Sequence, residues 1–157
     1  LKNEPVKEIE LLSYNNYRPG GMTALLDAVG GSIDGIEKQF TAELQNDEMS
    51  VVMVIITDGY ENASRYFTYH MVAQKIVGLD ETGKWTFSYL GADFDAIHTS
   101  KMMNIRKENV MNFRKKQYGS MMHDLSDSIG VYAEEKQKGN LKRDILDIFK
   151  KKDRTRD

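Results

Sequence analysis

Residues 51–59 read Val-Val-Met-Val-Ile-Ile-Thr-Asp-Gly, and this stretch decides the fold. The six residues before Thr57 are all apolar and mostly β-branched. Such an uninterrupted run is typical of a strand that is buried on both faces, as strands in parallel sheets are. The pair Asp58-Gly59 stands where that strand ends, and in open α/β sheets ligands bind at this end of the strands. The stretch therefore predicts a strand at 50–57 within a parallel sheet, with a carboxylate at its ligand-binding end.

Helical and strand-like patterns alternate along the rest of the chain. Apolar residues at steps of three and four predict helices over 25–40, 67–77 and about 115–135, the second of them stopped by Gly78. On the third helix the apolar stripe consists of Tyr118, Met122, Leu125, Ile129 and Tyr132. Shorter patterns predict strands at 6–12, 85–90 and 110–113, and a short helix through Ile97 and Met102. This alternation predicts an α/β protein with a parallel sheet flanked by helices.

The composition narrows the classes of function. The chain has 157 residues, which suits one domain, and a net charge of −2, which gives no general attraction to nucleic acid or to an anionic membrane. No apolar run approaches the ~18 residues that a membrane-spanning helix needs. Cysteine is absent, which excludes disulfides and thiolate metal sites, and we expect a cytoplasmic protein. The expected organisation is one domain at 1–138 followed by a charged tail at 139–157.

A second polar cluster, Pro19-Gly20-Gly21-Met22-Thr23, comes directly before the first predicted helix. A hydroxyl from this loop and the carboxylate of Asp58 can share one hard cation, because such cations prefer oxygen ligands. Each residue also has a plainer interpretation. Thr23 can cap the helix that follows it, and Asp58 can form the turn before Gly59. For Asp27, one turn into the helix, the expected role is interaction with the helix dipole.

Three stretches carry a family resemblance. They are residues 17–28 (Tyr-Arg-Pro-Gly-Gly-Met-Thr-Ala-Leu-Leu-Asp-Ala), residues 55–64 (Ile-Ile-Thr-Asp-Gly-Tyr-Glu-Asn-Ala-Ser) and residues 89–93 (Tyr-Leu-Gly-Ala-Asp). In this order and spacing they resemble the second metal loop, the third metal loop and the next strand of von Willebrand factor A-type domains, in a bacterial and phage branch of that family.

The resemblance implies a Rossmann-like fold that binds Mg²⁺, or Mn²⁺, through loops after the strands. Thr23 and Asp58 match the metal ligands of the second and third loops. The rim of the site is then formed by Gly21, Met22, Gly59, Tyr60, Glu61 and Asn62. The implied function is binding of another protein, whose acidic side chain completes the coordination of the metal. No catalytic residues are needed, so an enzyme is not expected.

One motif of the family is missing. The first metal loop, Asp-x-Ser-x-Ser after the first strand, does not occur in the expected place. Residues 124–128 have that spelling, but they lie within the apolar stripe of a predicted helix and follow no strand. We expect the first strand and its loop to lie upstream of Leu1. The sheet beside 51–56 would then be completed by that N-terminal segment or by another chain.

Two other classes of function stay open. One is a Mg²⁺-dependent phosphohydrolase on a related α/β fold, with Asp58, Asp93 and Asp95 around the metal. Residues 93–97 lack the Thr or Val that follows the Asp-x-Asp of haloacid-dehalogenase-like phosphatases, and no Gly-x-x-x-x-Gly-Lys loop occurs. The other is a structural subunit with a vestigial metal site. The three histidines are dispersed, so a zinc site is not expected.

Overall fold

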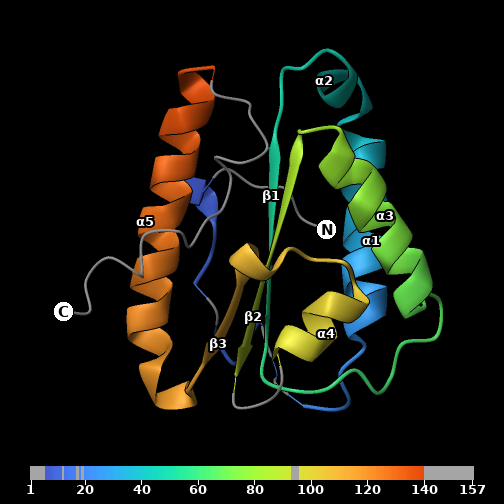
Figure 1. Ribbon diagram of the computed structural model, residues 1–157. Coiled ribbons are helices and arrows are strands. Elements are labelled where there is room, and N and C mark those ends of the chain that lie inside the picture. The colour runs from blue at the N-terminus through green and yellow to red at the C-terminus, as the bar shows by residue number, and fades with distance from the viewer. Residues whose placement is uncertain (1–5, 12, 17, 19, 93–95, 140–157) are drawn as a thin grey trace.

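The computed structural model describes residues 6–11, 13–16, 18, 20–92 and 96–139. Its helices are α1 (Leu25–Gln39), α2 (Thr41–Gln45), α3 (Tyr69–Glu81), α4 (Ala96–Met102) and α5 (Tyr118–Gln137). Its strands are β1 (Val51–Thr57), β2 (Trp85–Ala92) and β3 (Val110–Phe113). The three strands form one parallel sheet in the order β1-β2-β3 (Figure 1). The expected α/β class is confirmed, as a partial Rossmann-like arrangement.

Helices cover the sheet from both sides, as Figure 1 shows, with α1 and α3 on one side and α5 on the other. The larger core packs Val29 and Ile33 of α1 and Ile76 of α3 against odd-numbered residues of β1 and β2, such as Ile55 and Phe87. A smaller core joins Met121 and Leu125 of α5 to the opposite face of β2 and β3. Alternate residues of each strand therefore serve different helical layers, as the two-residue period of a strand requires.

The strand register brings the carboxyl ends of the strands to one edge of the sheet. Thr57 of β1 stands opposite Gly91 of β2, and Ala92 of β2 stands opposite Phe113 of β3. In an open parallel sheet this edge is the usual place for ligands. The segment that follows β1 begins at this edge, so Asp58 lies where the sequence analysis expects it.

β1 differs from its prediction in one respect. Within the described residues β1 pairs with β2 alone and is an edge strand. All eight residues of β2 are buried, but only Val51 and Ile55 of β1 are, and Ile56 is 40% exposed. The expectation that β1 is covered on both faces is therefore wrong for this part of the chain, because the layer above Val52, Val54 and Ile56 is incomplete.

Two further predictions of secondary structure are wrong. Residues 6–12 form no strand in their described part: a 3-10 turn spans Val6–Glu8, and Leu11 is 91% exposed. α3 does not stop at Gly78 but continues to Glu81, since a glycine inside a helix costs only about 1 kcal/mol relative to alanine. Its end is followed by Gly83, whose φ of +72° suits glycine.

The predicted stripe on α5 is only half right. Leu125 and Tyr132 are buried, whereas Tyr118, Met122 and Ile129 are 37–50% exposed. Residues 124–128 lie inside this helix, where the Ser128 hydroxyl donates to the Asp124 carbonyl at 2.8 Å. Residues 124–128 therefore do not form a loop after a strand. The predicted tail from residue 140 lies outside the described residues.

One glycine of α1 makes room for an aromatic ring. A Cβ on Gly30 would lie 2.3–2.5 Å from atoms of the Phe67 ring, whereas one on the adjacent Gly31 would meet nothing within 4 Å. Phe67 belongs to the segment that follows the loop after β1 and packs against the larger core. Gly30 thus holds this segment close to α1.

We expect Gly30→Ala to lower the free energy of unfolding by roughly 1–2 kcal/mol, since overpacking outweighs the ~1 kcal/mol gain in helix propensity. The matched control, Gly31→Ala, keeps only the gain and should raise stability by up to about 1 kcal/mol. Urea unfolding of both variants measures the difference. Equal effects of the two substitutions would show that Phe67 does not press on this helix.

No helix in the described part of the chain is long and apolar enough to cross a membrane.

Candidate functional site

The loop after β1 lies against the start of α1, although the two are almost 40 residues apart in sequence. Thr23 and Asn62 join them by two hydrogen bonds. The Thr23 N–H donates to the Asn62 side-chain oxygen at 2.8 Å, and the Asn62 N–H donates to the Thr23 carbonyl at 3.0 Å. The two loops that the sequence analysis singled out are therefore neighbours.

The Glu61 carboxylate accepts four hydrogen bonds in this junction. One carboxylate oxygen accepts from the N–H groups of Ala63 and Ser64, at 2.9 and 2.8 Å. The other accepts from the Leu26 N–H at 2.9 Å and from the Ser64 hydroxyl at 2.7 Å. The N-cap residue of α1, Ala24, has no side chain to satisfy the free N–H groups at the helix start. Glu61 supplies that cap from the loop, with a negative charge that suits the helix dipole.

Ser64 extends the same cap. Its hydroxyl accepts from the Asp27 N–H at 3.0 Å while it donates to Glu61. Two successive N–H groups of the first helical turn, those of Leu26 and Asp27, are thereby satisfied from one loop. The plainer sequence interpretation, with Thr23 as the N-cap, is wrong: Ala24 occupies that position and the capping groups come from a distant segment.

Asp27 holds the far end of the loop. Its carboxylate accepts from the N–H groups of Arg65, Tyr66 and Phe67, at 2.8, 2.9 and 2.8 Å. Asp27 does lie in the first turn of α1, as expected. Its main contacts, however, order the segment that delivers Phe67 to Gly30.

Both carboxyl groups favour their charged forms. Partial burial by itself raises the pKa of Asp27, but the N–H groups of Arg65, Phe67 and Tyr66 and the charge of Arg65 bring the pKa below its ordinary value. Burial likewise raises the pKa of Glu61, and its hydrogen bonds from Ser64, Leu26 and Ala63 outweigh that effect and lower the pKa. The loop is therefore clamped by two ionised side chains at neutral pH.

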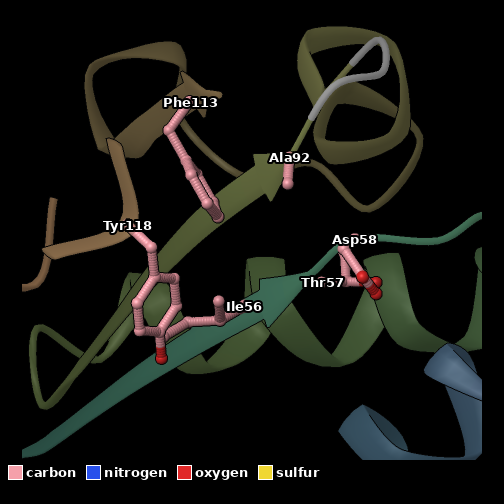
Figure 2. Close-up of a pocket in the computed structure, with 6 residues that line it drawn as sticks. All are labelled: Ile56, Thr57, Asp58, Ala92, Phe113 and Tyr118. Atoms are coloured by element: carbon pink, nitrogen blue, oxygen red, sulfur yellow. The ribbon is translucent and has the colours of Figure 1, made fainter. Parts of the chain in front are cut away.

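Thr23 and Gly59 approach one another closely at the edge of the sheet. The Thr23 hydroxyl oxygen lies 2.9 Å from the position of a Cβ on Gly59, so a larger residue there would collide with it. The turn itself is fixed by Thr57, whose hydroxyl accepts from the Gly59 N–H at 3.2 Å and donates to the Gly59 carbonyl at 3.0 Å. Asp58, between them, has an exposed side chain at the end of β1 (Figure 2).

These residues fit part of a site for a hard cation. Because Gly59 has no Cβ, the Thr23 hydroxyl can lie close to the turn that follows Asp58. Hydroxyl and carboxylate oxygens are the ligand types that Mg²⁺ and Mn²⁺ accept. In the described residues no three His, Cys, Asp or Glu side chains form a metal-binding group. Water and oxygens from elsewhere would have to complete the coordination.

The other predicted rim residues fall into two groups. Met22 and Tyr60 are 71% and 62% exposed, and Gly21 adopts a φ of +93° that suits glycine. They stand at the surface of the junction. Glu61 and Asn62 instead use their side chains to hold the loops together. Asp93 and Asp95, the other acids of the phosphohydrolase hypothesis, lie outside the described residues.

Two features of the junction have no signal in the sequence: the capping role of Ser64 and the hydrogen bonds of Asp27 to the loop. Both connect residues that are 37 or more positions apart in sequence, so no local pattern predicts them. Comparison of the chain with protein-family models, with curated proteins and with solved structures found no match. The fold and the site therefore define the chain as an α/β protein with two loops joined at the carboxyl edge of its sheet.

Proposed function

We propose that this protein is a metal-ion-dependent protein-binding domain of the von Willebrand factor A type, working in the cytoplasm. Thr23 and Asp58 hold Mg²⁺ or Mn²⁺ at the carboxyl edge of the sheet. An acidic side chain of another protein supplies a further ligand. Mg²⁺ suits this role because it takes oxygen ligands and retains exchangeable waters.

The observation that carries the proposal is the meeting of the two loops. The Thr23 hydroxyl lies 2.9 Å from the place of a Cβ on Gly59, the residue that follows Asp58 in the chain. The clamp of Glu61, Asn62 and Asp27 keeps the loops in this arrangement before any ligand arrives. Preorganisation of this kind raises affinity, because the loops need not be ordered on binding. The exposed Met22 and Tyr60 flank the site and offer contact area to a partner.

We expect Asp58→Ala to abolish Mg²⁺ binding to the full chain while leaving the fold intact, because no neutral oxygen replaces the charge of the carboxylate. Thr23→Val, which removes only the hydroxyl, should weaken binding. Isothermal calorimetry with Mg²⁺ measures both, and far-UV circular dichroism checks the fold.

Glu48→Ala serves as the control, since Glu48 is an exposed acid before the opposite end of β1. The control should bind Mg²⁺ like the wild type. Equal affinities of wild type and Asp58→Ala would contradict the proposal. Absence of any Mg²⁺ binding by the wild type would instead favour a structural subunit with a vestigial site.

A further inference from the structure

A pocket of about 250 Å³ opens beside the proposed metal site, at the carboxyl ends of all three strands (Figure 2). Its described lining consists of Ile56, Thr57, Asp58, Ala92, Phe113 and Tyr118. Pockets for drug-sized ligands begin at about 300 Å³. This one is smaller, so it suits a single side chain or a small molecule of similar size.

The lining divides into an apolar wall and a charged end. The rings of Phe113 and Tyr118 have centroids 6.2 Å apart and are tilted by 56°. In Figure 2 both rings project toward Ile56, while the Asp58 carboxylate lies at the other end of the group. Phe113 is buried and fixed, whereas Tyr118 is 50% exposed and borders the opening. A ligand can therefore contact carbon along its length and a carboxylate at its tip.

Charge decides the class of ligand. Among the described residues that line the pocket, Asp58 alone carries a charge, and it is negative. A metal ion is poorly matched to the aromatic wall, which offers no oxygens apart from the Tyr118 hydroxyl. An organic cation with an aliphatic chain matches both parts of the lining, because the chain suits the apolar wall and the charge suits the carboxylate. Its methylene groups pack on Ile56, Ala92 and the aromatic rings, and its charge meets Asp58 at the other end of the pocket.

We propose that this pocket binds an alkylammonium group, such as a lysine side chain or a small aliphatic amine. The site goes beyond the proposed metal-dependent function and does not depend on it. Both use Asp58, so the experiments below are made without divalent metal. A failure of metal binding then does not affect this proposal, and a failure of alkylammonium binding does not affect the proposed metal site.

The test follows amide chemical shifts of the full chain during titration with three probes. They are n-butylammonium, its neutral analogue n-butanol, and Nα-acetyl-lysine N-methylamide. We expect the two cations to shift residues 56–58 and 118 with dissociation constants on the order of millimolar, and butanol to bind several times more weakly. Similar binding of the lysine derivative assigns the pocket to a protein side chain, and binding of n-butylammonium alone assigns it to a free amine.

Two variants check the residues. Asp58→Asn should weaken n-butylammonium binding about fivefold and Tyr118→Ala about threefold, in line with a part-exposed charge pair and the loss of apolar contact along the alkyl chain. Tyr66→Ala is the control, because Tyr66 is 80% exposed and outside the lining. The proposal is overturned if butanol binds as tightly as n-butylammonium, or if Tyr66→Ala and Tyr118→Ala weaken binding equally.

Discussion

Glu61→Gln is expected to destabilise the protein by roughly 2–3 kcal/mol at neutral pH, the largest effect of any substitution in the loop. The wild-type carboxylate accepts four hydrogen bonds, from Leu26, Ala63 and both donors of Ser64. An amide of the same shape turns an NH₂ group toward two of these donors. Donors at the start of α1 or in the loop are then left without an acceptor. Chemical denaturation measures the loss, with Glu81→Gln, an exposed acid at the end of α3, as the control.

Glu61→Gln should also change how the stability of the fold depends on pH. The folded-state pKa of Glu61 is lowered, so its stabilising contribution is present above its ordinary pKa of 4.5 and is lost as the pH falls through the folded value. Wild type should therefore lose stability below about pH 4.5, and Glu61→Gln should lose less. Asp27 acts in the same direction, so some dependence remains in the variant. A variant as acid-sensitive as the wild type would show that Glu61 does not clamp the loop.

The second large effect concerns the free edge of β1. We expect the isolated 157-residue chain to self-associate, since β1 is a flat and uncharged strand that pairs on one side only within the described residues. Ile56, Val52 and Val54 leave apolar surface on the α5 side of this edge.

Sedimentation velocity tests this expectation over a range of concentrations. Ile56→Lys should weaken self-association at least about tenfold, because a lysine on an edge strand opposes pairing with another strand. Val77→Lys is the matched control, since Val77 is as exposed as Ile56, 39% against 40%, but lies on α3. A wild-type chain that stays monomeric and unfolds cooperatively at high concentration would contradict the account of this edge.

Local patterns predicted the elements that carry a clear apolar pattern, which is periodic in α1 and continuous in β1. The steps from Leu25 to Ile33 specified α1, and the apolar run before Thr57 specified β1. Local patterns failed where an element depends on contacts with a segment that is distant in sequence. The predicted strand at 6–12 has no pairing partner in the described part of the sheet. α3 continues through Gly78, and the glycine with a positive φ comes later, at Gly83.

The candidate site, too, could be predicted from the sequence only in part. The family resemblance predicts that Thr23 and Asp58 belong to neighbouring loops. The rule that parallel strands end at one edge accounts for Asp58 alone, because no strand precedes Thr23 among the described residues. The clamp could not be predicted, because it joins Glu61 to Leu26 and Asp27 to Arg65 across 35 and 38 residues. Nothing in the local sequence distinguishes a carboxylate that caps a distant helix from one at the rim of a binding site. Glu61 was accordingly expected at the rim.

The most direct test of the central claim is a Mn²⁺ titration of the labelled full chain, followed by paramagnetic broadening of amide resonances. The account predicts that Thr23 and Gly59 broaden first, that excess Mg²⁺ reverses the broadening, and that Asp58→Ala abolishes it. Broadening centred elsewhere, for example at the exposed acids Asp34 and Glu81, with Thr23 and Gly59 unaffected, would contradict the claim that these two loops form a metal site.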